Sequence, residues 1–531
     1  MTKIILSGKE AKSKMLKGVT DTVDIVKITM GPAGRNVLLN NVMTQKITKD
    51  GVSVAKEIKF DDPVMEAGAR LVKEAAQKTC DESGDATTLT SVLIEAILNS
   101  ANKHCHDIKP IELKRILDRN CKIVTDYLKN ISIDCADDDI MLRNVAYIST
   151  NSDKELSKLV FDAIKKATKD GAVGIESSMT DKSYVDTVTG MRFERGYESQ
   201  YFQNDENGKI CMFESPNIII YRGKIDNIPS LVKILEPSIN IGRPVVIMAD
   251  DYSEDIINAL TINKVQNGFK LCAIKTPSFK VQREAMVSDL EILLGCHAIN
   301  TPKWPIDKFD VNIHLGSCDK IVIDRHYTTI TGGDGSEAAL NTRIEEIRRA
   351  IDNSDNKDEI ARLKERLVKL SGGVSIIYIG SDSETETTEI KDRADDAVCA
   401  VRSAMQEGIV PGGGAALFSA TNLFEKEDNN IRNMMFDILI APMKQIADNA
   451  YMTDEEFQSC VKYIQNAYKK DKVICGISYH DKLPYTRIMN NMIEAGVVDP
   501  TKSIRTAFEN AVSVASMLLT TEACVIEDFN K

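Results

Sequence analysis

The chain has 531 residues, of which 43% are hydrophobic, and its 67 basic and 79 acidic side chains give a formal net charge of −12. At about 100–200 residues per domain, this length predicts about three or four domains and excludes a module with a single core. The acidic balance argues against binding to nucleic acid or to an anionic membrane, and the ordinary globular composition argues against disorder.

Twelve cysteines are dispersed along the chain without any CxxC pair. Their spacing fits neither a zinc site nor a disulfide framework, and scattered thiols are typical of a reducing compartment. The nearest approach to a metal cluster is His104-Cys105-His106, but such neighbours on a helix point in different directions. The N-terminus has no signal-peptide pattern, and no segment reaches the ~18 apolar residues of a membrane span. We therefore expect a soluble protein of the cytoplasm.

The first third of the chain shows mainly helical periodicity. Apolar residues at three- and four-residue steps predict a helix over 9–30, which the breaker Gly31-Pro32-Ala33-Gly34 ends. Alternating apolar residues predict short strands over 36–40 and 46–57, with Asp50-Gly51 as a hairpin-type turn. Further helices are predicted over 63–78, after Thr88 and after Pro110.

The middle of the chain alternates between strand-like and helix-like segments. Apolar runs predict strands over 218–221, 245–248, 271–274 and 321–323, with helices over 228–235 and 255–266. This alternation is typical of an α/β domain. Two helices over 336–352 and 357–370 and a strand over 374–379 follow.

The last third returns to helices. An apolar face between Ile390 and Met405 predicts a helix, and Pro411-Gly412-Gly413-Gly414 interrupts the pattern. The final long helix is predicted to begin at Asp499-Pro500, with Asp499 as the N-cap and Pro500 in the first helical position. The order helical, α/β, helical indicates a helical domain that carries an α/β insertion.

Several common enzyme motifs are absent from the sequence. There is no GxxxxGK[ST], no GxGxxG after a strand and no GxSxG, and the six histidines are scattered. Ordinary P-loop, Rossmann and serine-hydrolase chemistry therefore has no support.

Gly/Asp/Thr clusters remain as candidates for chemistry. The segment 84–88 precedes a helix, where free N–H groups favour phosphate, although a helix cap is the simpler interpretation of this cluster alone. The segment 49–51 suits a tight turn, and 412–414 suits either close approach to a ligand or a hinge. Asp392, Asp395 and Asp396 form either a solvated acidic face or a carboxylate group directed at a metal–phosphate site.

The order and spacing of these segments together point to a family. The segments are ITMGPAGRNV at 28–37, ITKDGVSVA at 47–55, GDATT at 84–88, GIVPGGG at 408–414, VDPTK at 498–502 and TTE at 520–522. With them, the chain resembles the group I chaperonins, the GroEL type, over nearly its whole length.

The resemblance implies a multidomain α+β/α fold with nested insertions. It assigns 1–133 and 406–531 to a mostly helical equatorial ATPase domain, 134–188 and 374–405 to a small intermediate domain, and 189–373 to an α/β apical domain that binds clients.

The resemblance also implies a nucleotide site with ATP and Mg²⁺ as cofactors and K⁺ as a further candidate ion. Asp85 is implied to hold Mg²⁺, and Asp50 and Asp396 are implied as catalytic carboxylates that orient or deprotonate water. The nucleotide-binding residues carried over from the family are Thr29, Met30, Gly31, Pro32, Lys49, Asp50, Gly51, Asp85, Ala86, Thr87, Thr88, Leu89, Gly412, Gly413 and Asp499.

Partners follow from the same resemblance. The family binds non-native proteins on an apolar apical groove, forms homo-oligomeric rings and in many members works with a GroES-like co-chaperonin. No nucleic acid or membrane partner is expected, and the location is the bacterial cytoplasm, or that of an infected host if the protein is viral. The residues that match the client-binding surface are Tyr197, Ser199, Tyr201, Phe202, Val232, Leu235, Ile257, Thr261 and Ile262.

Some positions depart from the family pattern. Ala86 stands where the family has glycine, and Leu89 where it has a threonine on phosphate. The adenine-side loop at 478–485 and the apical segment 277–280 also differ. The departures at Ala86, Leu89 and the adenine-side loop motivate an alternative in which the protein is an ATPase-impaired holdase or assembly scaffold. A metabolic phosphotransferase is a third and weaker hypothesis.

Overall fold

The computed structural model describes residues 3–40, 45–167, 172–178, 180–188, 190–205, 210–277, 281–354, 356–371, 374–381, 383–471, 473–478 and 487–527. The chain divides into two compact units. Unit 1 comprises Met1–Phe161, Ser177–Ser183 and Ile379–Lys531, and unit 2 comprises Asp162–Glu176 and Tyr184–Tyr378. Unit 1 therefore contains both ends of the chain, and unit 2 is inserted into it.

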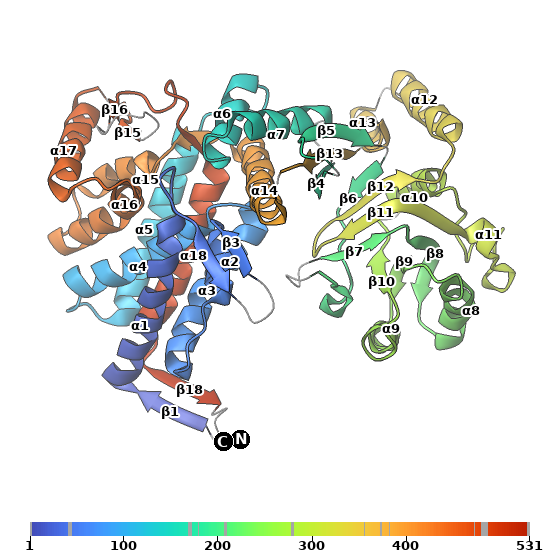
Figure 1. Ribbon diagram of the computed structural model, residues 1–531, viewed down its shortest axis with the longest axis horizontal. Coiled ribbons are helices and arrows are strands. Elements are labelled where there is room, and N and C mark those ends of the chain that lie inside the picture. Colours follow the sequence, from blue (N-terminus) through green and yellow to red (C-terminus); the bar gives the residue numbers. More distant parts are fainter. Residues whose placement is uncertain are drawn as a thin grey trace. The chain divides into compact units, whose positions relative to one another are not determined.

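Unit 1 is built around a bundle of long helices (Figure 1). Helix α18 packs against α3, α4 and α5 and is buried along most of its length, because its sequence is apolar or small on nearly every face. The bundle helices are α1 (Gly8–Val26), α3 (Pro63–Ser83), α4 (Thr87–His104), α5 (Pro110–Ile131), α16 (Asn429–Asn449) and α18 (Thr501–Thr520).

Shorter elements surround this bundle. The helices are η1 (Lys27–Thr29), α2 (Gly51–Glu57), α6 (Asp139–Ser149), α14 (Glu384–Glu407), α15 (Ala415–Ser419), η4 (Ala420–Phe424) and α17 (Asp454–Asp471); α7 (Lys154–Ala167) continues from unit 1 into unit 2. Four antiparallel strand pairs join β1 (Lys3–Ser7) with β18 (Ala523–Glu527), β2 (Val37–Asn40) with β3 (Gln45–Thr48), β14 (Ile409–Pro411) with β17 (Val498–Pro500), and β15 (Gly476–Ser478) with β16 (Arg487–Met489).

Unit 2 contains a seven-stranded mixed sheet with the order β10-β9-β8-β11-β12-β6, in which β7 also pairs with β11. The β8–β9 and β9–β10 pairs are parallel, and the other pairs are antiparallel. The strands are β6 (Gly190–Phe193), β7 (Cys211–Glu214), β8 (Asn217–Ile225), β9 (Val245–Tyr252), β10 (Leu271–Lys275), β11 (Leu315–Ile323) and β12 (Thr328–Gly333). A smaller sheet has the order β4 (Ala172–Ser177), β13 (Val374–Ile379), β5 (Tyr184–Val188).

Helices cover the large sheet and complete one apolar core (Figure 1). Helix α8 packs on β8, and α9 packs on β10. The helices are η2 (Gln200–Phe202), α8 (Ile228–Ile239), α9 (Glu254–Asn267), α10 (Val281–Leu294), η3 (Ile306–Lys308), α11 (Val311–His314), α12 (Glu337–Asn353) and α13 (Lys357–Ser371). The strands and helices predicted for this region are thus confirmed.

Two local predictions from the sequence are wrong. The segment predicted as a strand over 46–57 is strand only through Thr48, and Gly51–Glu57 forms α2. The reason is that the Asp50 carboxylate caps this helix, accepting from the N–H groups of Val52 at 3.1 Å and Ser53 at 2.9 Å. Asp499 is not the cap of the last helix, because it lies in β17 opposite Val410 and the helix begins after Pro500.

None of the helices within the described residues is both long enough and apolar enough to span a bilayer.

Candidate functional site

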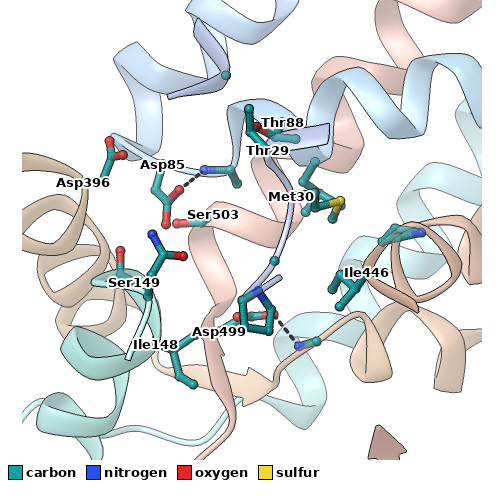
Figure 2. Close-up of a pocket in the computed structure, with 18 of the residues that line it drawn as sticks. Thr29, Met30, Asp85, Thr88, Ile148, Ser149, Asp396, Ile446, Asp499 and Ser503 are labelled. Carbon is teal, nitrogen blue, oxygen red and sulfur yellow. Dashed lines mark hydrogen bonds between the residues drawn. The ribbon is translucent and has the colours of Figure 1, made fainter. Parts of the chain in front are cut away.

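One cavity in unit 1, with a volume of about 270 Å³, collects residues from distant parts of the chain. Figure 2 shows Asp85, Asp396, Asp499 and Ser503 around it. Of the nucleotide-site residues implied by the resemblance, those that line the cavity are Thr29, Met30, Gly31, Pro32, Lys49, Asp50, Gly51, Asp85, Ala86, Thr87, Thr88, Leu89, Gly413 and Asp499, together with the implied catalytic Asp396. Gly412 is adjacent to Gly413 in the chain but is not part of the cavity wall.

The first wall segment follows η1, where Thr29 ends the helix. The Thr29 hydroxyl donates to the Val26 carbonyl at 2.9 Å and lies 3.2 Å from the Thr88 hydroxyl. The amide of Asn449, at the end of α16, donates to the carbonyls of Lys27 and Met30, both at 2.9 Å. These bonds fix the backbone of 29–32 against the cavity.

The second wall segment is the N-terminus of α2. A Cβ added at Gly51 would come within 2.3 Å of the Thr88 hydroxyl oxygen, so only glycine lets α2 approach α4 this closely. The Asp50 carboxylate is at the same time the helix cap and part of the cavity wall. The predicted hairpin-type turn at Asp50-Gly51 is therefore wrong, because Asp50 caps α2 and Gly51 begins it.

The third wall segment leads into α4. Gly84 has φ +73° and a Cβ there would come within 2.2 Å of the Cys399 Cβ. Ala86 also has a left-handed backbone with φ 70°, which is costly for a residue with a Cβ. No side chain caps α4, so the interpretation of 84–88 as a simple helix cap is wrong. Instead, the Asp85 carboxylate accepts from the Ala86 N–H (Figure 2).

Helix α14 supplies the fourth wall, with Asp392 and Asp396. Asp392 pairs with Lys46 of β3 at 2.9 Å, which ties α14 to the β2–β3 hairpin. The prediction of a solvated acidic face is therefore wrong for Asp392 and Asp396, and Asp395 alone of the three aspartates is exposed.

Four carboxyl groups in the cavity, those of Asp85, Asp392, Asp396 and Asp499, have raised pKa values. Burial is the main cause in each, and neighbouring carboxylates add to it. The pKa of Asp396 lies well above its usual range because of burial and the nearby Asp50 and Asp85. Burial and the nearby Asp50 raise the pKa of Asp85. Burial and Asp85 raise the pKa of Asp499 to about 7, although the Gly413 N–H at 3.1 Å opposes the shift.

The glycine run 412–414 connects β14 to α15. A Cβ at Gly414 would come within 2.8 Å of the Met443 backbone nitrogen, and one at Gly412 would meet Val498 at 3.0 Å. At Gly413 a Cβ would only contact Met492 and Ile477 at 3.6 and 3.7 Å, but the φ of +63° favours glycine, and its N–H donates to Asp499 (Figure 2). Close packing therefore accounts for Gly412 and Gly414, and backbone conformation accounts for Gly413.

The sequence reasoning missed the α6–α7 connection. Asn151 and Ser152 line the cavity and both have positive φ, 56° and 68°. The Asn151 side-chain oxygen accepts from the Lys49 ammonium at 3.2 Å. Burial lowers the pKa of Lys49, which Glu389 partly offsets. The run Asn151-Ser152-Asp153 was the one available signal in the sequence, because Asn tolerates left-handed backbone.

Arg393 of α14 also lines the cavity and was not predicted. Its guanidinium pairs with Glu389 at 2.9 Å and with Asp153 at 3.6 Å, and it donates to the Thr150 carbonyl at 3.3 Å. These contacts join α14 to the α6–α7 connection, next to the carboxyl groups of the cavity.

The implied Mg²⁺ fits this donor set. Hard oxygen ligands suit Mg²⁺, which usually takes one or two carboxylates together with phosphate and water. Asp85 is a half-buried carboxylate close to other acidic groups, so a cation would relieve their repulsion. No cluster of three or more His, Cys, Asp or Glu side chains forms a metal site by itself in the described part of the chain. His104 instead contacts Asp437 at 2.8 Å, and the neighbouring Cys105 is buried.

The residues matched to the client-binding surface all lie in unit 2 and differ in exposure. Tyr201, Val232 and Ile262 are 62%, 47% and 50% exposed. Phe202 and Leu235 are buried in the core, and direct client contact at these two positions is therefore a wrong prediction. The half-buried members are Tyr197, Ser199, Ile257 and Thr261. Segments 278–280 and 479–486, which include most of the two divergent loops, lie outside the described residues.

The whole fold is that of a chaperonin. It is similar to the crystal structure of the chaperonin gp146 from bacteriophage EL 2 (Pseudomonas aeruginosa) in the presence of ATP-BeFx, crystal form II, with 20% identity, 99% of both chains covered and a TM-score of 0.62. Crystal form I of the same protein gives 20% identity, the same coverage and a TM-score of 0.59. The family model of the TCP-1/cpn60 chaperonin family matches residues 23–228 and 229–528. The chain belongs to this family.

Proposed function

We propose that the protein is an ATP-dependent chaperonin that assembles into homo-oligomeric rings and promotes the folding of non-native proteins. The observation that carries the proposal is the cavity of unit 1, where Asp50, Asp85, Asp396 and Asp499 meet the N-termini of α2 and α4. The positive ends of these helices suit phosphate, and the carboxyl groups suit a divalent cation.

The roles of the residues follow from their places in the wall. Lys49 and the first N–H groups of α4 would hold the phosphates, with the hydroxyls of Thr87 and Thr88 as further donors, because these residues line the cavity. Bound Mg²⁺ would supply charge neutralisation of the phosphates. Asp396 and Asp50 would orient the attacking water and accept its proton. A cation beside Asp85 would also lower the pKa of Asp396 and so favour the ionised base.

Non-native clients would bind to unit 2. Val232 of α8, Ile262 of α9 and Tyr201 of η2 present exposed apolar surface, which binds unfolded chains through the hydrophobic effect. The neighbouring exposed residues Ile228 and Val265, at 52% and 64%, enlarge this surface. A co-chaperonin of the GroES type is a proposed further partner. The three-domain division, with an intermediate domain over 134–188 and 374–405, is part of the same proposal.

The ATPase is tested with Asp396→Ala. The purified wild type should hydrolyse ATP slowly in the presence of Mg²⁺, and the variant should lose about 100-fold or more of this rate, the usual effect of removing a general base. Asp395→Ala is the matched control, because Asp395 is the next residue on α14 but is exposed and outside the cavity. Equal rates for Asp396→Ala and wild type would contradict the catalytic role.

The holdase alternative has a specific structural basis. Ala86 adopts a left-handed backbone where a Cβ is unfavourable, and the apolar side chain of Leu89 lines the cavity. Refolding of a denatured test enzyme separates the two functions. We expect recovery that requires Mg²⁺-ATP, whereas suppression of aggregation that is independent of ATP would favour the holdase.

A further inference from the structure

Ser503 differs from the other polar residues at the start of α18. It lies in the first turn, it is 1% exposed, and its hydroxyl oxygen has no hydrogen-bond partner in the part of the chain that the structure describes. By contrast, the Thr501 hydroxyl lies 2.7 Å from the Ser132 hydroxyl, and Lys502 donates to Gln406 at 2.9 Å. A buried hydroxyl without a partner is unfavourable and uncommon, so it needs an explanation.

The usual partner of a helical serine is absent here. Serine in a helix commonly donates to the carbonyl one turn earlier, as Ser91 of α4 does to Thr87 at 3.2 Å. For Ser503 that residue would be Asp499, which is paired with Val410 in the β14–β17 ladder. Among the described residues, the Ser503 hydroxyl therefore has no hydrogen-bond partner, which leaves it available to a bound group.

The cavity is the place from which such a group would come. Ser503 lines it, and Figure 2 shows its side chain on the side of the cavity where Asp85 lies. Helix α18 has 20 residues and begins after Pro500 without a side-chain cap, so its N-terminus carries a positive dipole end. A hydroxyl donor at such a helix end suits an anionic oxygen better than a neutral one.

We infer that the Ser503 hydroxyl donates a hydrogen bond to a phosphate oxygen of the bound nucleotide. The inference rests on the proposed nucleotide site. It adds α18 to α4 as a helix whose N-terminus would face the phosphates, together with a residue that the motif pattern did not indicate. Ser503 is thus a ligand-binding residue and does not take part in bond breaking.

Two serines of one helix allow a matched test. Ser503→Ala removes the proposed donor, and Ser516→Ala removes a second buried, unpartnered hydroxyl of α18 that lies outside this cavity. We expect Ser503→Ala to weaken the binding of Mg²⁺-ATP about 5- to 10-fold, measured by titration calorimetry on the full chain, and Ser516→Ala to change it less than about twofold. Unchanged affinity of Ser503→Ala, or an equal loss in both variants, would overturn the inference.

Thermal unfolding separates a ligand contact from a structural role. Without nucleotide, Ser503→Ala should melt no lower than wild type, because an unpaired hydroxyl is replaced by a methyl group. With saturating Mg²⁺-ATP, its gain in melting temperature should be smaller than that of wild type. A lower melting temperature without nucleotide would show a structural role and overturn the inference.

Dideoxy-ATP, which lacks both ribose hydroxyls, distinguishes phosphate from ribose. Ser503→Ala should reduce the binding affinity by the same factor for ATP and for dideoxy-ATP. A reduction confined to ATP would mean that Ser503 contacts the ribose instead. If wild type binds no Mg²⁺-ATP, the proposed function itself fails. If wild type binds and Ser503→Ala binds equally well, only the inference about Ser503 fails.

Discussion

Asp50 connects folding and chemistry at a single residue. Each of its carboxylate oxygens accepts one N–H group of α2, and Asp50 also faces the cavity. Because a carboxylate has about four acceptor positions, it can cap the helix and still contact a ligand. The same side chain therefore starts the helix and contributes negative charge beside Asp85 and Asp396.

Asp499 predicts a pH dependence of stability. Its pKa in the folded protein is about 7, above the ordinary 3.8. An acid whose pKa is higher in the folded state binds its proton more tightly there, so its unfavourable contribution is complete above pH 7 and declines as the pH falls. We expect nucleotide-free Asp499→Asn to melt about 2–4 °C above wild type at pH 8, and less at pH 6, in differential scanning calorimetry.

Asp499→Asn changes only the charge and the titration of this side chain, because the amide oxygen of asparagine can still accept from the Gly413 N–H. A difference between the two proteins that stays constant from pH 6 to pH 8 would mean that Asp499 does not titrate in this interval.

At the scale of elements, one buried carboxylate holds a helical hairpin on unit 2. Asp289 of α10 has a side chain that is 1% exposed and accepts from Arg343 of α12 at 2.9 Å. Arg366 of α13 donates twice to the same carboxylate, both times at 2.8 Å. Each of the two helices is therefore tied to α10 by charge, whereas the helices themselves carry few fully buried apolar residues.

Removing this carboxylate should destabilise unit 2. Asp289→Ala leaves two partly buried guanidinium groups without this partner, which typically costs about 3–5 kcal/mol. The measurement is chemical unfolding of the full chain, with hydrogen exchange expected to rise first in α12 and α13. Glu345→Ala is the control, since the exposed pair of Glu345 and Arg349 should contribute less than about 1 kcal/mol. Equal stabilities of the two variants would contradict the anchoring role.

At the scale of the whole molecule, the chain leaves unit 1, forms unit 2 and returns to complete unit 1. The cavity combines residues before and after this insertion, such as Asp85 with Asp499. Folding of unit 1 therefore requires segments more than 400 positions apart to meet, which makes it intrinsically slow.

Ring assembly predicts a particle much larger than one chain. One subunit has a mass of 58.8 kDa. We expect light scattering coupled to size-exclusion chromatography to give a multiple of this mass, with and without Mg²⁺-ATP, and electron microscopy to show closed rings. A homogeneous particle of one subunit mass under both conditions would contradict the proposed assembly.

Much of the fold was predictable because its signals are local. Periodicity located several of the long helices, such as α1, α3 and α14, but α16 and α17 were not predicted, and apolar runs located β8, β9 and β10. The segment after Asp50 was mistaken for a strand, since Val52 and Val54 alternate in a stretch of only seven residues. The capping carboxylate of Asp50 stabilises a helix here, and so short an apolar pattern cannot show whether helix or strand is the more stable structure.

The sequence by itself determined the family, the nested order of segments and the motif residues of the cavity wall, because motif order is a property of the chain alone. Only the tertiary structure decided which carboxyl groups come close enough to raise one another's pKa, that Asn151 and Arg393 join the wall, and that Phe202 is core. Burial and Coulomb interaction depend on distances between residues far apart in the sequence, and no local pattern encodes these distances.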